Sequence, residues 1–167
     1  RGTTAYKVAE DISPRLAKDA VAARVSGVLQ NLQDEILEDS SLEIITVNQP
    51  EGLEILRHSA AHVMAEAVKR LYPQAKLAIG PAIDNGFYYD FDVPEAFSPE
   101  DLTRIEAEMQ KIVKEDQEFT HWELDRETAI KEFAAMGEEY KVELLEEMED
   151  DKVSVYQQGE LIDLCRG

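Results

Sequence analysis

One stretch of this chain constrains the fold more than any other. Residues 52–72 have the apolar spacing of an amphipathic helix and carry His58-Ser-Ala-Ala-His62. At about 100° per residue, one helix face presents an apolar stripe that should pack on a core. The stripe consists of Leu56, Ala60, Val63, Met64, Ala67 and Leu71. The two histidines fall nearly opposite the stripe, so we predict that they lie outside the core, with Ala61 and Ala65 leaving room for a ligand.

His58 and His62 are spaced by four residues, which places them about one turn apart on the same helix face. Both rings can therefore converge on one water, metal ion or substrate. Taken alone, this spacing more often belongs to a solvated or merely hydrogen-bonded pair of histidines. The third histidine, His121, has no such companion, and we expect a surface or capping role for it.

The distribution of charge predicts two modules. The 167 residues carry a formal net charge of -19, which argues against a general nucleic-acid binder because phosphate neutralisation needs a basic surface. Residues 1–50 hold 5 basic and 8 acidic side chains, and residues 51–167 hold 12 and 28, giving -3 against -16. We therefore expect a boundary near Pro50, with the linker Asn48–Gly52 acting as a hinge. With 44% apolar residues, the chain can build one sizeable domain or two small ones.

Two further features of the sequence limit the cellular compartments in which the protein is expected. No run approaches the ~20 apolar residues of a membrane span, and no signal peptide opens the chain. The single cysteine, Cys165, excludes an internal disulfide and fits a reducing compartment. The chain begins without methionine, and we expect it to be a segment of a longer protein.

Residues 1–47 predict a small α+β module. A helix capped by Thr3 or Thr4 should run to Ile12 and end at Ser13-Pro14, because the residue before proline avoids the helical region. A hairpin over residues 21–29 should turn at Ser26-Gly27, and residues 42–47 should form a strand. Helix, hairpin and strand are what remains of a β-grasp module without its opening strands. The module contains no histidine or cysteine, so we expect binding or docking rather than catalysis.

Residues 48–167 predict a larger α+β module. The histidine helix should lead into an aromatic hairpin over residues 77–91, whose turn Asp84-Asn85-Gly86 suits positive φ angles. Next comes a helix over residues 98–116, with a buried stripe formed by Leu102, Ile105, Met109, Ile112 and Val113. The remaining predicted elements are a strand at 119–124, helices at 125–136 and 140–148, and strands at 153–157 and 161–165.

Five short motifs follow one another along the chain: His58-x3-His62, Ile79-Gly80-Pro81, the run Asn-Gly-Phe-Tyr-Tyr-Asp at 85–90, Tyr140-Lys141-Val142, and Asp163-Leu164-Cys165-Arg166-Gly167. In order and spacing they resemble the N-terminal half of bacterial-type threonyl-tRNA synthetases. Residues 1–47 resemble the ubiquitin-like TGS domain, incomplete at its start. Residues 48–167 resemble the editing domain, which is related to the second additional domain of alanyl-tRNA synthetases, incomplete at its end.

The resemblance implies an α+β editing domain, with the histidine helix against an antiparallel sheet, that hydrolyses serine wrongly esterified to tRNA(Thr). A synthetase pocket sized for threonine cannot strongly reject serine, because one methyl is worth only about 1–3 kcal/mol. A second site that excludes the methyl supplies the remaining discrimination. The implied partners are the acceptor end of tRNA(Thr) and the remainder of the synthetase, which would be a cytoplasmic or organellar homodimer. ATP, Mg and zinc are expected only in the catalytic core outside this segment.

Carried over residue by residue, the resemblance places the chemistry on His58, His62, Lys141, Asp163 and Cys165, with Tyr89 and Gly80 at the pocket. His58 and Lys141 are expected to activate the attacking water and the leaving ribose hydroxyl. Asp163 is expected to hold the substrate's amino group, while His62 and Cys165 shape or polarise the site.

Other interpretations of these residues stay open. His58, His62 and Cys165 are possible zinc ligands, although the resemblance favours editing without a metal. Lys141 could instead form a surface ion pair, and Cys165 could be a buried structural thiol. The alternative functions are a non-catalytic module that orients tRNA and a zinc-dependent deacylase. The basic residues expected nearest the acceptor end are Arg57, Lys69, Arg70 and Arg166.

Overall fold

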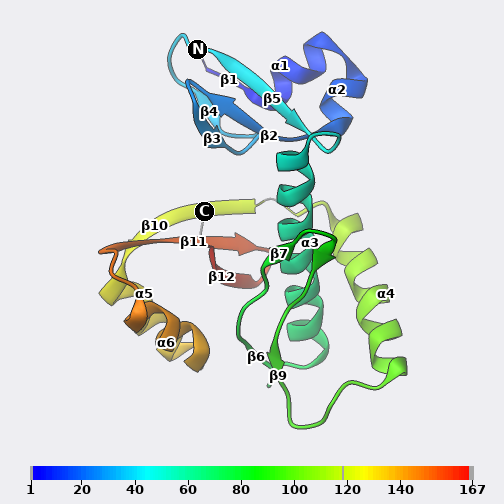
Figure 1. Ribbon diagram of the computed structural model, residues 1–167, viewed down its shortest axis with the longest axis vertical. Coiled ribbons are helices and arrows are strands. Elements are labelled where there is room, and N and C mark those ends of the chain that lie inside the picture. The colour runs from blue at the N-terminus through cyan, green and yellow to red at the C-terminus, as the bar shows by residue number, and fades with distance from the viewer. Residues whose placement is uncertain (1, 118, 166–167) are drawn as a thin grey trace. The chain divides into compact units, whose positions relative to one another are not determined.

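The computed structural model (Figure 1) describes residues 2–117 and 119–165, without the side chain of Cys165. The chain divides into two compact units. One comprises Arg1–Ser59 with Ala82–Gly86, and the other comprises Ala60–Pro81 with Phe87–Gly167. Six helices and several short antiparallel sheets among the described residues agree with the predicted mixture of helix and antiparallel strand.

The first unit contains a small sheet with two helices. Its three-stranded antiparallel sheet has the order β3-β2-β5, and β1 pairs separately with β4. The bounds are β1 (Thr3–Thr4), α1 (Ala5–Ile12), α2 (Pro14–Asp19), β2 (Ala20–Val25), β3 (Val28–Gln30), β4 (Glu35–Ile36) and β5 (Leu42–Thr46). The predicted helix, hairpin and strand are confirmed. The β1–β4 pair was not predicted, because two-residue strands carry no periodicity.

Local side-chain chemistry accounts for the helix starts in this unit. The Thr4 hydroxyl accepts a hydrogen bond from the Lys7 amide at 3.1 Å, which caps α1 as predicted. Ser13 ends α1 and caps α2 through the Arg15 amide, with Pro14 at the first position of α2. The turn between β2 and β3 uses positive φ at Ser26 and Gly27, so the predicted hairpin turn is confirmed.

Helix α3 (Pro50–Leu71) carries both histidines of the HxxxH motif. It begins two residues before the predicted start, so Pro50, Glu51 and Gly52 belong to the helix rather than to a linker. A Cβ atom at Gly52 would overlap the carbonyl of Thr46, so glycine lets the helix start close to β5. The division between the compact units falls inside α3, whereas the predicted domain ranges 1–47 and 48–167 follow composition and stay a prediction.

The predicted burial of α3 is partly wrong. Leu56 of the predicted stripe is 45% exposed, whereas Ala61 and Ala65, on the other face, are 1% and 0% exposed. Two sides of the second-unit part of α3 are covered, because Ala67 and Val68 pack in one cluster and Ala65 packs with Leu77 and Leu161 in another. His62, on this second side, is therefore buried at 7% exposure, contrary to the expectation that it avoids the core.

The aromatic hairpin after α3 consists of two short ladders. The outer ladder pairs β6 (Lys76–Leu77) with β9 (Phe91–Asp92), and the inner one pairs β7 (Ala82–Ile83) with β8 (Gly86–Phe87). Asp84, Asn85 and Gly86 all lack positive φ, so that detail of the prediction is wrong. Arg57 Nη1 instead supports the turn by donating to the carbonyls of Ile83 and Asp84, at 3.3 and 2.7 Å.

Helix α4 (Pro99–Glu115) begins as predicted, because Ser98 and Asp101 form a reciprocal capping box. Ile105 and Ile112 are buried against α3, and Met109 packs beside them. Two predicted core residues, Leu102 and Val113, are instead 58% and 65% exposed. Only one narrow face of α4 packs against the hydrophobic residues of α3, so residues at the edges of the predicted stripe remain in solvent.

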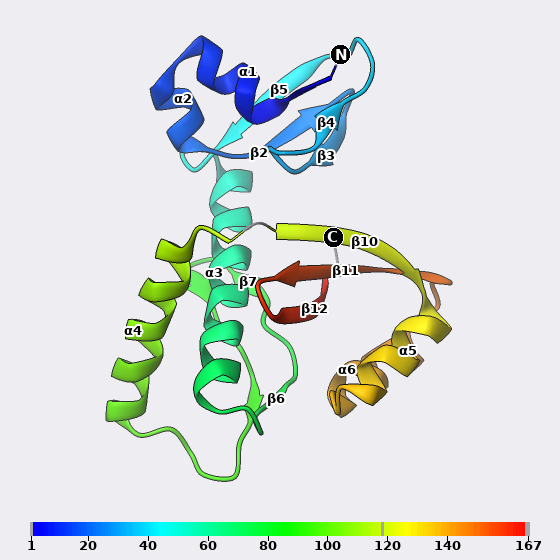
Figure 2. The ribbon, with the colours of Figure 1, turned by 180° about the vertical axis from the view of Figure 1, so that it is seen from behind.

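The rest of the second unit is a three-stranded antiparallel sheet with two helices. Figures 1 and 2 show α5 and α6 together on one face of this sheet. The bounds are β10 (Phe119–Asp125), α5 (Arg126–Ala135), α6 (Glu139–Glu147), β11 (Lys152–Gln158) and β12 (Leu161–Cys165). These elements agree with the predicted ones to within one residue at every end. Positive φ at Gly137 and Gly159 ends α5 and turns the β11–β12 hairpin.

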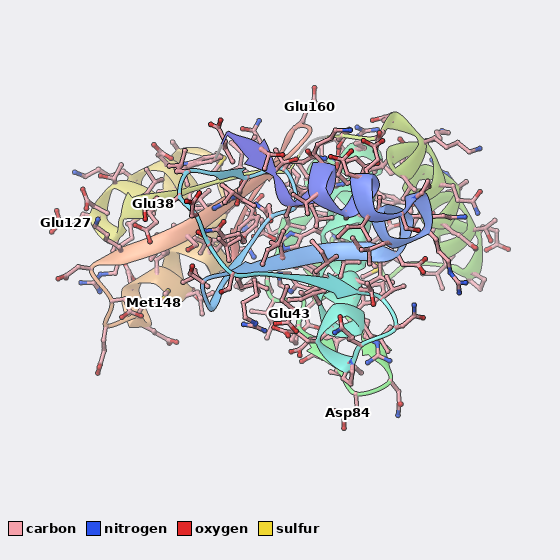
Figure 3. All side chains as sticks on the ribbon, turned by 90° about the horizontal axis from the view of Figure 1, so that it is seen from above. Glu38, Glu43, Asp84, Glu127, Met148 and Glu160 are labelled. Carbon is pink, nitrogen blue, oxygen red and sulfur yellow. The ribbon has the colours of Figure 1, made fainter. Side chains whose placement is uncertain are left out.

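The surface of the described residues is strongly acidic. In Figure 3 the labelled acids Glu38, Glu43, Asp84, Glu127 and Glu160 project outward from the ribbon, and all five are exposed. None of the described helices combines the length and apolarity that a membrane crossing requires.

The capping box of α4 makes folding stability sensitive to acid. The Tyr72 hydroxyl donates to Asp101 Oδ1 at 2.6 Å, and with the Ser98 donors this lowers the pKa of Asp101 from 3.8 to about 2. A lowered folded-state pKa stabilises the fold above the unfolded value, and this stabilisation is lost as pH falls from about 4 towards about 2. We expect Asp101→Asn to lower the thermal midpoint at neutral pH and to flatten its decline over that acid range, measured by circular dichroism. Glu100→Gln is the control, and an unchanged decline in Asp101→Asn would contradict this account.

Candidate active site

The sheet β10-β11-β12 presents two chemically different faces. Its strand register alternates side chains strictly, so neighbours across the ladder share a face. The face towards α5 and α6 is apolar and is formed by Trp122, Leu124, Val153, Val155, Ile162 and Leu164. The opposite face carries the register neighbours His121, Tyr156 and Asp163. The alternation of β12 thus places Asp163 on the polar face.

Asp163 is the centre of a buried polar cluster. Lys141 Nζ lies 2.6 Å from Asp163 Oδ1, and the Tyr89 hydroxyl donates to Asp163 Oδ2 at 2.8 Å. Lys141 also donates to the Tyr89 oxygen at 3.2 Å, and His62 Nδ1 lies 3.5 Å from Asp163 Oδ2. The Lys141 and Asp163 side chains are only 5% and 3% exposed. Four residues up to 101 positions apart in sequence thus meet in one cluster.

Lys141 reaches the cluster from the first turn of α6. The corner before it is fixed by Glu138, which is 5% exposed and pairs with Lys69 of α3 at 2.5 Å. Glu138 also accepts a hydrogen bond from the Leu77 amide at 3.2 Å. Because β12 is an edge strand, a side chain from α6 has access to Asp163. Lys141 is therefore a buried, paired cation rather than the surface ion pair of the alternative interpretation.

The Tyr89 side chain contacts both Asp163 and Gly80. The Tyr89 ring lies so close to Gly80 that a Cβ atom there would overlap the ring. The ring also stacks on Phe91, with centroids 4.9 Å apart. Burial and the neighbouring charge of Asp163 both raise the pKa of the Tyr89 hydroxyl above its usual value, so it stays protonated and donates to Asp163.

His62 belongs to a short column of rings. Its ring lies 6.4 Å from that of Tyr156, and Tyr156 lies 5.6 Å from His121, both pairs being stacked at 25°. His121 is exposed, as predicted, and connects through Tyr156 with the buried His62. Tyr156 was not predicted as a site residue, because a tyrosine in an alternating strand shows only which face of the sheet it occupies.

The remaining predicted site residues are His58 and Cys165. His58 is half-buried on α3 and belongs to the first compact unit. Cys165 pairs with Ser154 in the β11–β12 ladder, and its side chain lies outside the described part of the chain, as does Arg166. The prediction that these residues share one pocket with His62, Lys141 and Asp163 stays a prediction.

The described side chains around His62 do not fit a zinc centre. His62 lies beside the Asp163 carboxylate, whose charge is already balanced by the buried Lys141 ammonium. A divalent cation would be repelled by that ammonium, and zinc sites need three or four converging ligands. Within residues 2–117 and 119–164, no three histidine, cysteine, aspartate or glutamate side chains converge in this way.

Three of the four basic residues expected near tRNA make contacts within the protein, and the fourth, Arg166, lies outside the described residues. Lys69 pairs with Glu138, and Arg70 pairs with Glu66, Glu108 and Glu115. Arg57 supports the β7–β8 turn. The positive charges of Lys69 and Arg70 are therefore largely offset by acidic neighbours.

Comparison with known proteins agrees with the resemblance over the whole chain. Residues 1–46 match the TGS domain family. The threonine–tRNA ligase of Carboxydothermus hydrogenoformans is 54% identical over 165 residues, which cover 98% of this chain and 26% of that protein. The ligases of Syntrophomonas wolfei and Clostridium tetani are each 52% identical over 99% and 100% of the chain, again covering 26% of each protein. The chain thus spans about a quarter of the length of these relatives, and over its whole length it is similar to the N-terminal region of threonyl-tRNA synthetases.

Proposed function

We propose that this segment carries an editing site that hydrolyses the ester of seryl-tRNA(Thr) without a metal. The observation that carries the proposal is the buried cluster in which Asp163 holds Lys141, Tyr89 and His62 together. A buried lysine paired to a carboxylate is expensive to build, and such groups gather at functional sites. The cluster also contains four of the residues that the sequence resemblance assigned to editing or to its pocket.

Ester hydrolysis requires three things of such a site. The water oxygen attacks the carbonyl carbon, negative charge develops on the carbonyl oxygen, and the ribose oxygen leaves with a proton. The Lys141 ammonium, fixed by Asp163, is a donor that can stabilise the carbonyl oxygen or protonate the ribose oxygen. His58 and His62 are the bases available for the water proton. Asp163 already bonds Lys141 and Tyr89, so a substrate amino group would share this carboxylate.

Selectivity would come from the wall of the pocket. Water and the basic groups treat seryl and threonyl esters alike, so the chemical step cannot distinguish them. The Tyr89 ring, which contacts Gly80 and stacks on Phe91, would be the surface against which the extra methyl of threonine clashes. In an editing site, the discrimination between the two esters would therefore come from the shape of the pocket.

The histidines provide the experiment that tests the proposed function. We expect His58→Ala combined with His62→Ala to lower the single-turnover rate of seryl-tRNA(Thr) hydrolysis by at least about 100-fold, since general acid–base catalysis contributes roughly 10²–10⁴-fold. His121→Ala is the matched control, because His121 is exposed and lies at the far end of the ring column. An unchanged rate in the double variant, with the fold intact, would refute the proposal.

The main alternative is a module that orients tRNA without cleaving it. The charge of -16 after residue 50 opposes this, because few phosphates can be neutralised by 12 basic against 28 acidic side chains. We expect the isolated segment to bind tRNA(Thr) with a Kd weaker than about 10⁻⁶ M at ~0.15 M salt, measured by fluorescence anisotropy. Tighter binding without hydrolysis would favour the orienting module instead.

A further inference from the structure

Glu138, the residue before α6, joins three elements of the second unit through one carboxylate. Its Oε1 pairs with Lys69 of α3 at 2.5 Å, and its Oε2 accepts a hydrogen bond from the Leu77 amide of β6 at 3.2 Å. The residue is only 5% exposed, so solvent cannot replace these contacts. Both oxygens of a buried carboxylate are thus used to hold the start of α6 against α3 and β6.

The Glu138 backbone also defines the start of α6, which carries Lys141 in its first turn. The Glu138 carbonyl accepts hydrogen bonds from the Lys141 and Val142 amides, at 3.1 and 3.2 Å. The Glu138 side chain, in contrast, makes no capping bond to the helix. A lysine in the first turn is also disfavoured by the positive end of the helix dipole. The carboxylate therefore fixes where α6 lies rather than stabilising the helix itself.

The two partner elements carry other side chains of the Asp163 cluster. Helix α3 places His62 about two turns before Lys69, on the same helix face. The β6–β9 ladder lies next to Tyr89, which is two residues before Phe91 at the start of β9. One buried carboxylate therefore links the segments that carry Lys141, His62 and Tyr89.

The charge of Glu138 also acts on the Tyr89 hydroxyl. Burial is the main cause that raises the pKa of this hydroxyl, followed by the charge of Asp163 and its hydrogen bond, and the Glu138 charge acts in the same direction. Glu138 therefore helps to keep Tyr89 protonated, as a donor to Asp163.

We propose that Glu138 is a positioning residue for the proposed ester hydrolysis, and that it holds the Lys141 ammonium in the place beside Asp163 and Tyr89 that the reaction requires. This inference rests on the proposed function. Glu138 acts through Lys141 rather than on the substrate. A misplacement of about 1 Å in such a group can cost about 100-fold in rate, even when the mutation is distant from the reacting atoms.

The first test is single-turnover hydrolysis of seryl-tRNA(Thr) by a full-length synthetase containing this segment. We expect Glu138→Ala to lower the maximal rate about 100-fold, with little change in the enzyme concentration that gives half of that rate. Glu138→Gln keeps the side-chain length and an acceptor for the Leu77 amide, so it should recover part of the loss. The matched control is Glu139→Ala, because Glu139 pairs with Lys76 at the surface and its side chain is 71% exposed.

Equal maximal rates in Glu138→Ala and Glu139→Ala would overturn the proposal. A rise in the half-saturating concentration without a fall in the maximal rate would also overturn it, because that result would indicate a contact with tRNA. Should Glu138→Ala not fold, Glu138→Gln must still be slower than Glu139→Gln for the proposal to stand.

The second test measures the position of Lys141 without hydrolysis. Its side chain is 5% exposed, so acetylation by acetic anhydride should be slow relative to the exposed Lys131, as measured by mass spectrometry. We expect Glu138→Ala to raise the acetylation rate of Lys141 severalfold and Glu139→Ala to leave it unchanged, with both variants folded by circular dichroism. Unchanged acetylation in Glu138→Ala would overturn the positioning role.

Failure of the proposed function would give a different result from failure of this inference. A synthetase whose hydrolysis is unaffected by the combined His58→Ala and His62→Ala changes would refute editing, and with it a role of Glu138 in editing. If that variant is slow while Glu138→Ala is as fast as Glu139→Ala, only the inference about Glu138 fails.

Discussion

Replacing Lys141 with methionine should destabilise the second unit by about 3–5 kcal/mol, because the change leaves the Asp163 carboxylate buried without its cation. Both side chains are almost fully buried, at 5% and 3% exposure, so solvent cannot take over the lost interaction. A loss of this size is a large part of the 5–15 kcal/mol that stabilises a typical domain. Urea unfolding followed by circular dichroism measures it.

Two further variants separate the buried charge from the loss of a lysine. Lys76→Met removes an exposed ion pair with Glu139, whose side chain is 71% exposed, and should change the unfolding midpoint little. Lys141→Met combined with Asp163→Leu removes both buried charges and should recover part of the lost stability, because the Tyr89 hydroxyl then lacks its acceptor. If the double variant were as unstable as Lys141→Met, the penalty would not come from an unpaired Asp163.

Replacing Gly80 with alanine should impair hydrolysis more than it impairs folding. The added methyl would overlap the Tyr89 ring and push the tyrosine hydroxyl away from Asp163 and Lys141. A displacement of about 1 Å in a positioned group can cost about 100-fold in rate, whereas overpacking typically costs about 1–3 kcal/mol of stability. We expect a single-turnover rate on seryl-tRNA(Thr) about 100-fold below that of the unchanged chain.

The hairpin contains its own control for this substitution. A Cβ atom at Gly86 would have no heavy atom within 4 Å, so Gly86→Ala should leave the rate unchanged. The Tyr89 hydroxyl can be tested separately with Tyr89→Phe, which keeps the ring and removes the donor to Asp163. A Gly80→Ala rate equal to that of Gly86→Ala would show that Tyr89 does not position the site.

The sequence predicted most elements because their ends are marked by side-chain chemistry. Ser98-Pro99 begins α4, Thr4 caps α1, and Gly137 and Gly159 take the positive φ that their turns require. These signals lie within a few residues of the feature that they determine, so a single sequence reveals them. The β1–β4 pair has no such signal, because its two strands are only two residues long.

Burial of α3 could not be predicted from periodicity alone. The apolar stripe identifies one covered face, but Ala61 and Ala65 are small enough for a second layer to pack closely on another side. The residues that form this layer, such as Leu77 and Leu161, are distant in sequence. The burial of Lys141 could not be predicted from the sequence either, since a lysine among glutamates has the pattern of a solvated helix face.

The most direct test of the account is the ratio of the hydrolysis rates of seryl-tRNA(Thr) and threonyl-tRNA(Thr), measured under single-turnover conditions with the 167-residue chain and with a full-length synthetase containing it. The account predicts much faster cleavage of the seryl ester by both proteins, and a ratio that falls in Gly80→Ala but not in Gly86→Ala. Equal rates on the two esters would contradict the claim that the Asp163 cluster is an editing site.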